Sequence, residues 1–208
     1  MYNIRIWDND ILIEADDTLF SPKSIDKGTS IMLKNIELKS SDKVLDLGCG
    51  TGVVGLAISK VIGADKVTMA DINPKAITCS INNAKLNGLD SINIRESNGF
   101  GNIMEKDFTL ILSNPPYHTD FSVAKHFIEE GKKYLALNGK VVVVVKRLEW
   151  YKNKMENVFG GVRIIQEDDY YVLISEKRDN YSKSLKNEKP INKKHMKRVE
   201  KSQKKHRY

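Results

Sequence analysis

The chain of 208 residues is poor in cysteine and in long apolar runs, and both shortages exclude whole classes of protein. Its two cysteines, Cys49 and Cys79, are too few for a disulfide scaffold or a zinc site. The longest apolar run, Val141–Val145, has five residues, far below the ~20 that a membrane helix needs. The first ten residues carry three charges and no apolar core, which argues against a signal peptide. We therefore expect a soluble, cytoplasmic protein with neither a metal site nor a membrane partner.

Acidic residues are scarce at the C-terminal end. Residues 177–208 contain 13 of the 34 Lys and Arg but only 3 of the 27 Asp and Glu, a net charge of +10. The preceding 176 residues carry a net charge of −3. A basic arm of this kind is typical of a chain that binds a polyanion such as nucleic acid, and a merely solubilising tail is the alternative. Its few apolar residues predict disorder in the free protein.

The rest of the chain alternates between strand and helix patterns. An N-terminal β-hairpin is predicted over 2–13, turning at Asp8-Asn9-Asp10, and a helix over 29–36. Strands are predicted at 44–47, 66–70, 92–94, 108–112, 141–145, 162–165 and 170–174. Helices are predicted between them at 53–62, 74–86, 122–137 and 147–155. This order predicts an α/β fold with a doubly wound, mostly parallel sheet of seven strands. We expect three parts: residues 1–40 capping a cofactor site, a core at 41–176, and the basic tail at 177–208.

The strongest local pattern follows the first predicted core strand. Gly48, Gly50 and Gly52 lie between that strand and a helix, where they permit a tight turn and close approach of a ligand to the backbone. Asp46 precedes them by two residues and can face a ligand ammonium group. Asp71 ends the next strand, where an acid can bind both hydroxyls of a ribose.

These residues resemble the class I S-adenosylmethionine (SAM) methyltransferases. The segment Asp46-x-Gly48-x-Gly50-x-Gly52 is similar to the first motif of that family, and Asp71 to its ribose-binding acid. The resemblance implies S-adenosyl-L-methionine as the cofactor. It also implies that Ile72 packs against the adenine ring, and that Asn98 stands where the family often has an Asp that accepts from the adenine amino group.

Asn114-Pro115-Pro116-Tyr117 ends the fourth core strand, at the edge where open α/β sheets place their sites. The Asn114 side chain and the Pro115 carbonyl can accept both N–H groups of a planar exocyclic nitrogen, and Tyr117 can stack on its ring. We therefore assign catalysis to these four residues. In the methyltransferases this tetrapeptide serves adenine N6, guanine N2 and glutamine N5 alike, so it indicates the kind of nitrogen and leaves the substrate open.

A second resemblance narrows the substrate. The stretch Leu19–Thr29 and the His118 that follows Tyr117 are similar to the methyltransferase small domain group, which includes ribosomal small-subunit RNA guanine-N2 methyltransferases. This implies that Phe20 and the segment Asp26-Lys27-Gly28 lie over or near the cofactor. We assign His118, Lys146 and Arg147 to substrate binding, and guanine N2 of ribosomal RNA as the acceptor. The alternatives are adenine N6 in RNA or DNA, protein glutamine N5, and a catalytically idle RNA-binding module.

Overall fold

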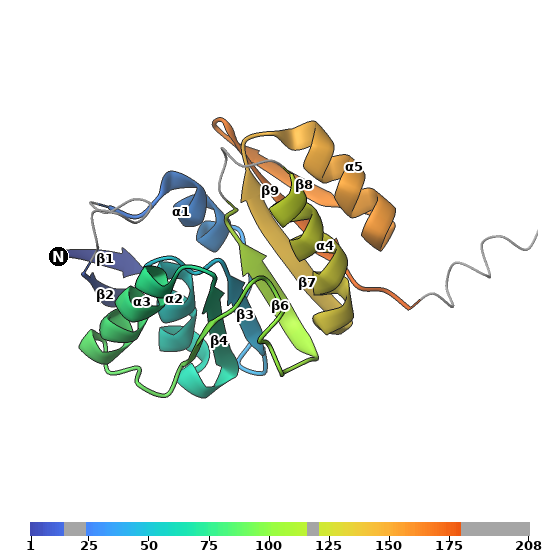
Figure 1. Cartoon of the computed structure of the whole chain (residues 1–208). Coiled ribbons are helices and arrows are strands. Elements are labelled where there is room, and N and C mark those ends of the chain that lie inside the picture. Colours follow the sequence, from blue (N-terminus) through green and yellow to red (C-terminus); the bar gives the residue numbers. More distant parts are fainter. Residues whose placement is uncertain (15–23, 116–120, 180–208) are drawn as a thin grey trace, which may run out of the picture. The chain divides into compact units, whose positions relative to one another are not determined.

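The computed structural model describes residues 1–14, 24–115 and 121–179. Residues 1–177 form one compact unit built on a sheet of seven strands in the order β5-β4-β3-β6-β7-β9-β8. Neighbouring strands are parallel from β5 to β7, whereas β9 runs antiparallel to both β7 and β8. The predicted seven-stranded, mostly parallel sheet is confirmed (Figure 1). The strands are β3 (Val44–Leu47), β4 (Val67–Asp71), β5 (Asn93–Glu96), β6 (Phe108–Ser113), β7 (Leu135–Val145), β8 (Arg163–Glu167) and β9 (Tyr170–Glu176).

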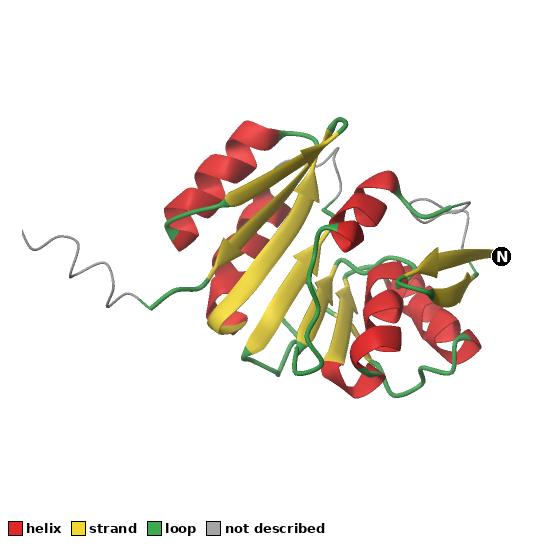
Figure 2. Ribbon diagram, turned by 180° about the vertical axis from the view of Figure 1, so that it is seen from behind, coloured by secondary structure: helices red, strands yellow, loops and turns green. Residues whose placement is uncertain are grey.

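Helices cover both faces of the sheet, as Figures 1 and 2 show from opposite sides. The helices are α1 (Lys27–Lys34), α2 (Val53–Ile62), α3 (Pro74–Leu86), α4 (Ser122–Tyr134) and α5 (Leu148–Phe159), with a short 3-10 turn at Ala64–Lys66. Strand β7 separates the two cores: Val142 and Val144 pack with α1 and α2, whereas Val141, Val143 and Val145 pack with α4 and α5. The uninterrupted valine run is therefore buried on both faces, as a central strand should be. No helix in the described ranges is long and apolar enough to cross a membrane.

The predicted N-terminal hairpin is present as β1 (Tyr2–Ile6) and β2 (Asn9–Ile13). Its turn lies one residue earlier than expected, at Trp7 and Asp8, whose φ angles are 46° and 63°. Two consecutive residues with positive φ make a two-residue turn that matches the twist of paired strands. Asn9 therefore belongs to the second strand, where it pairs with Ile6.

The hairpin is attached to the core by two asparagines, one in α3 and one that caps the C-terminal end of this helix. Asn87 Oδ1 accepts from the backbone N–H of Leu12 at 3.0 Å, and its Nδ2 donates to the Leu12 carbonyl at 2.8 Å. Asn83 binds both backbone groups of Glu14 in the same way, and its Nδ2 also donates to the carbonyl of Thr51 at 2.9 Å. Buried polar groups need such partners, so these amides replace a neighbouring strand. They also tie the hairpin to the glycine-rich loop.

The start of β7 differs from the prediction. The expected helix over 122–137 ends at Tyr134, and β7 already begins at Leu135. Asn138 has a φ of 64°, and the pairing of β6 with β7 shifts register between Phe108 and Leu110. A Cβ at Gly139 would lie 2.7 Å from the Phe108 carbonyl oxygen, so the strand requires glycine there. A break of this kind in a strand leaves no periodic signal in the sequence.

Helix α2 packs so closely on β4 that Gly55 has no room for a side chain. A Cβ at this position would lie 2.1 Å from Sδ and 2.5 Å from Cγ of Met69, which is fully buried. We expect Gly55→Ala to lower the free energy of unfolding by about 2 kcal/mol, although alanine favours an exposed helix. The check is denaturant unfolding against Gly131→Ala, a helical glycine whose added Cβ would meet its nearest neighbour, Val141, at 3.4 Å. Equal stability of the two variants would contradict this packing account.

Candidate cofactor and acceptor site

A cavity of about 500 Å³ opens at the carboxyl ends of the parallel strands. Its walls come from the segments that follow β3, β4, β5 and β6, together with the residues before and within α1 and two residues of α4. This is the edge of the sheet at which the sequence predicted the site. The volume suits a small organic ligand such as a nucleoside.

The glycine-rich loop forms one wall of the cavity. The φ angles of Gly48, Gly50 and Gly52 are 78°, 56° and 89°, a region that side chains disfavour. The backbone N–H of Gly48 donates to the carbonyl of Ala70 at 2.8 Å, and that of Gly50 donates to Asp71 Oδ2 at 2.9 Å. The loop between β3 and α2 is therefore fastened to the end of β4.

Asp71 is held at the cavity wall by backbone groups on both of its oxygens. Besides the bond from Gly50 to Oδ2, the N–H of Asn73 donates to Oδ1 at 2.9 Å. Asn73 in turn caps α3 by accepting from the N–H of Lys75 at 3.0 Å. A carboxylate oxygen has more than one acceptor site, so a carboxylate fixed in this way can still bind two hydroxyl groups of a ligand.

Asp46 lies deeper in the same wall. The residue is 3% exposed, and its Oδ2 accepts from the backbone N–H of Gly55 at 3.0 Å. Burial raises the pKa of Asp46 to about 7, the Gly55 N–H opposes that rise, and the charge of Asp71 adds to it. A cationic group in the cavity would hold this carboxyl ionised. The thiol of neighbouring Cys49 has a pKa raised by burial and by Asp46, so it is protonated at neutral pH and cannot serve as a nucleophile.

Two further predicted cofactor residues line the cavity near Asp71. Ile72 is 61% exposed, an unusual exposure for a large apolar side chain, and it lies against the cavity. Asn98 is exposed at the cavity, directly after Ser97, whose N–H donates to the carbonyl of Asp71 at 2.8 Å. Phe20, the remaining predicted cofactor residue, lies outside the described residues.

Asn114 follows β6 and lies on the opposite side of the cavity. Its Nδ2 donates to Asp26 Oδ2 at 2.7 Å and to Thr29 Oγ1 at 3.0 Å, both from the N-terminal end of α1. An ionised carboxylate can only accept, so the amide nitrogen must face Asp26, and the amide oxygen is turned away from α1. Pro115 is buried and also lines the cavity. Pro116, Tyr117 and His118 lie outside the described residues.

The structure does not place Lys146 or Arg147 in the cavity lining. Both are exposed after β7. The ammonium group of Lys146 lies 2.7 Å from Asp169 Oδ2, which raises its pKa, and 4.6 Å from the centre of the Tyr170 ring. The Arg147 guanidinium lies 6.0 Å from the centre of the Phe121 ring. A substrate would have to extend beyond the cavity to reach them.

Several cavity residues were not assigned from the sequence. Tyr2 of the hairpin and Phe127 of α4 line the cavity, and Thr29 contacts Asn114. Asp26 was expected near the cofactor through the family resemblance, but its bond to Asn114 was not. The sequence offered a signal for the helix cap alone, because Asp is a preferred N-cap whose side chain accepts from the backbone N–H three residues later, which here is that of Thr29. Across the described ranges, no three His, Cys, Asp or Glu residues are grouped as a metal site would need.

The sheet order, the glycine-rich loop and the two acids at the ends of β3 and β4 together define a Rossmann-like methyltransferase. The sequence model of the methyltransferase small domain family matches residues 10–175, and the chain belongs to this family. The family resemblance noted from the sequence is thereby confirmed.

Two curated relatives illustrate the range of the family. Ribosomal RNA small subunit methyltransferase C of Psychromonas ingrahamii is 33% identical over 178 residues, which cover 84% of this chain and 50% of that protein. The uncharacterized protein YbxB of Bacillus subtilis is 27% identical over 182 residues, covering 85% of this chain and 90% of that protein. The chain therefore spans about half the length of this methyltransferase C relative and most of YbxB.

Solved structures share the fold. The 16S rRNA N2 G1207 methyltransferase (RsmC) of T. thermophilus, in complex with AdoMet and guanosine, superposes with a TM-score of 0.78 at 23% identity, covering 85% of this chain and 50% of that one. A methyltransferase from Pyrococcus furiosus gives a TM-score of 0.68 at 21% identity and covers 81% of this chain and 90% of that one.

Proposed function

We propose that the protein is a SAM-dependent N-methyltransferase that methylates an exocyclic amino group of RNA, namely N2 of guanine in ribosomal RNA. The observation that carries the proposal is the Asn114 amide, which Asp26 and Thr29 hold at the edge of the cavity in one orientation. The substrate is supported by the names of the methyltransferase C relatives and by the guanosine in the RsmC complex. An RNA acceptor of this kind also supports a cytoplasmic location.

The residues of the cavity suit S-adenosyl-L-methionine. Asp71 offers two fixed carboxylate oxygens for the ribose hydroxyls, and Asp46 offers a buried negative charge for the ammonium group. Ile72 presents an exposed apolar surface for the adenine ring, and Asn98 an amide for its amino group. When bound, the cofactor supplies an electrophilic methyl group. We further propose that residues 1–40, including Phe20, cap this site on the core formed by 41–176.

The residues after β6 would orient the acceptor nitrogen. The Asn114 amide oxygen and the Pro115 carbonyl accept the two N–H groups of the base, so that the nitrogen lone pair turns from the ring toward the methyl group. Pro116 and Tyr117 are proposed to complete this acceptor site, with Tyr117 stacking on the base. His118, Lys146 and Arg147 bind flanking parts of the RNA. Rate enhancement then comes from positioning: the nitrogen would take the methyl carbon as the bond of that carbon to sulfur breaks, and the surplus proton on the nitrogen would then pass to water.

The test is methyl transfer by the full chain from isotopically labelled SAM into a mixture of unmodified ribosomal RNA and ribosomal protein, followed by separation of the two polymers. Label in the RNA is the expected result. Label in protein would replace the RNA acceptor with a glutamine amide. The absence of label in either polymer, with SAM still bound, would favour an idle binding module.

We also propose that the basic tail at 177–208 contributes to RNA affinity through its net charge of +10. A chain that ends at Asp179 loses 11 of the 13 Lys and Arg of this tail. Each phosphate contact that is lost should reduce the slope of log K against log salt by about 0.7–0.9. We therefore expect the shortened chain to bind RNA more weakly at low salt and with a shallower salt dependence, while its SAM affinity is unchanged. Filter binding over a salt series measures this, and identical slopes for the two chains would contradict it.

A further inference from the structure

We propose that Asp26 and Thr29 are positioning residues that set the rate of methyl transfer through Asn114. This inference rests on the proposed function. It adds that methyl transfer requires two residues outside the acceptor motif at 114–117. In this account the N-terminal end of α1 determines which end of the Asn114 amide faces the base. Helix α1 is thus part of the catalytic apparatus although it precedes the core of the fold.

The geometry leaves one orientation for the amide. Both contacts from α1 are made to Asn114 Nδ2, at 2.7 Å from Asp26 Oδ2 and 3.0 Å from Thr29 Oγ1. A flipped amide would place its oxygen against the carboxylate of Asp26, and two acceptors at that distance repel each other. Hydrogen bonds to a charged group are worth roughly twice those between neutral groups, so Asp26 contributes the larger share.

The same oxygen of Asp26 also begins the helix. Oδ2 accepts from the backbone N–H of Thr29 at 2.9 Å, which makes Asp26 the N-cap of α1. The carboxylate therefore has a fixed direction before any ligand binds. Thr29 is 8% exposed, so its hydroxyl is equally restricted.

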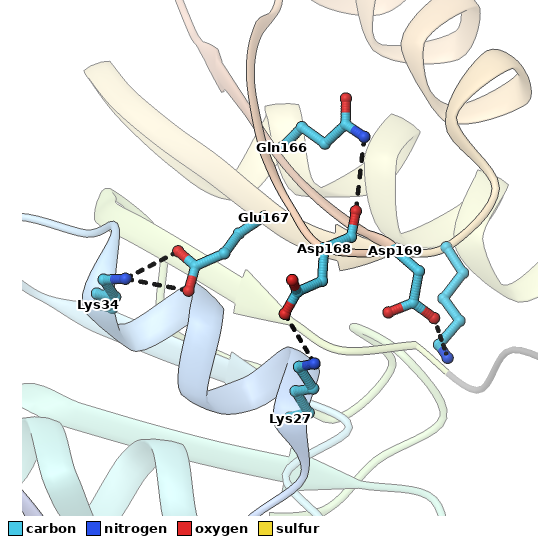
Figure 3. A network of polar contacts seen from close by, with 7 residues as sticks. Lys27, Lys34, Gln166, Glu167, Asp168 and Asp169 are labelled. Carbon is cyan, nitrogen blue, oxygen red and sulfur yellow. Dashed lines mark hydrogen bonds and ion pairs between the residues drawn. The ribbon is translucent and has the colours of Figure 1, made fainter.

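Helix α1 is itself fastened to the sheet. Ile31, Met32 and Leu33 are buried in the core that α1 shares with β7. On its exposed side, Lys27 lies 2.7 Å from Asp168, in the turn between β8 and β9, and Lys34 lies 3.0 Å from Glu167, the last residue of β8 (Figure 3). Exposed ion pairs contribute little energy, so the buried residues fix the helix and the pairs only restrict its sliding.

The experiment compares variants that keep the helix cap but differ in their reach to Asn114. Ser and Asn both cap helices well, but the serine side chain is too short to contact Asn114. We expect Asp26→Ser to lower kcat about 10- to 100-fold with little change in the Kd for SAM, and Asp26→Asn to lose far less. Thr29→Val should lower kcat about 3- to 10-fold and Thr29→Ser should restore most of it. Asp90→Ser, an equal charge change at an exposed site, is the control.

A double-mutant cycle separates positioning from general damage. In an Asn114→Ala background, Asp26→Ser should cost no further rate, because the group through which it acts is already gone. Side-chain amide NMR gives a readout that does not depend on activity: Asp26→Ser should speed hydrogen exchange at Asn114 Nδ2, whereas Asp90→Ser should not.

Additive losses in the cycle, or unchanged exchange at Asn114 Nδ2, would overturn the positioning role while methyl transfer by the unmodified chain remained intact. Absence of transfer by the unmodified chain would instead overturn the proposed function and this inference with it.

Discussion

Replacing Asn114 with alanine is expected to lower the rate of methyl transfer by about 10²–10³-fold, the range found when one preorganised polar contact is removed from an active site. The Kd for SAM should change little, because the cofactor groups proposed here are Asp46, Asp71 and their neighbours. The physical reason is positional: without the amide oxygen, the acceptor nitrogen keeps its lone pair delocalised into the ring and is poorly oriented.

Single-turnover transfer from labelled SAM measures this effect without the contribution of product release. Asn114→Asp is an instructive companion, since it keeps the size and an oxygen but places a second carboxylate about where Nδ2 lies 2.7 Å from Asp26. We expect it to be as impaired as the alanine variant. Asn153→Ala, at an exposed site on α5, serves as the control. Transfer by Asn114→Ala within a few-fold of the unmodified chain would contradict the assignment.

Asp46→Asn is expected to weaken SAM binding and stabilise the fold at the same time. Loss of a buried partner for the ligand ammonium group should raise the Kd about 10²-fold. Asparagine can still accept from the backbone N–H of Gly55, but it carries no charge that burial penalises. The free energy of unfolding should therefore rise at pH 8, by something on the order of 4 kcal/mol.

The stability gained by Asp46→Asn depends on pH, and the direction follows from the pKa of Asp46. The pKa of Asp46 is about 7 in the folded chain, against its ordinary value of 3.8. Between those two values the folded chain keeps a proton that the unfolded chain has released, so stability falls as pH rises through this window. Below it, both states are protonated, and the Asp46→Asn variant should differ little from the unmodified chain. In the same window SAM affinity should rise with pH, because the ionised carboxylate is the form that binds a cation.

Thermal or denaturant unfolding of both chains without ligand, at pH 4, 6 and 8, measures the stability difference. Calorimetric titration with SAM at the same pH values measures affinity. A stability difference that does not grow with pH would show that the Asp46 carboxyl titrates normally, and an unchanged Kd would remove it from the cofactor site.

Local sequence patterns predicted much of the fold and the position of the site. The strand and helix alternation from Val44 onward is set by short apolar runs separated by glycine and proline, so the parallel sheet and the edge that carries the site could both be predicted. Asp46, Gly48, Gly50 and Asp71 lie close to one another because they come from the carboxyl ends of the neighbouring parallel strands β3 and β4 and from the loop after β3. That proximity follows from topology alone.

Contacts between distant segments could not be predicted in this way. Asp26 and Asn114 are separated by 88 positions, and nothing in either local sequence indicates that they meet. The hydrogen bonds from Asn83 and Asn87 to the hairpin were missed for the same reason, because an asparagine in a helix or at its C-terminal cap normally suggests a solvated surface. The early start of β7 was missed because Leu135–Leu137 continues the apolar pattern of α4.

Methylation of guanine N2 is decided by identifying the nucleoside that receives the methyl group. The full chain would be incubated with SAM carrying a deuterated methyl group and with unmodified small-subunit ribosomal RNA, and the RNA then digested to nucleosides for mass spectrometry. We expect deuterium in N2-methylguanosine. Deuterium in N6-methyladenosine, or in no nucleoside at all, would contradict this expectation.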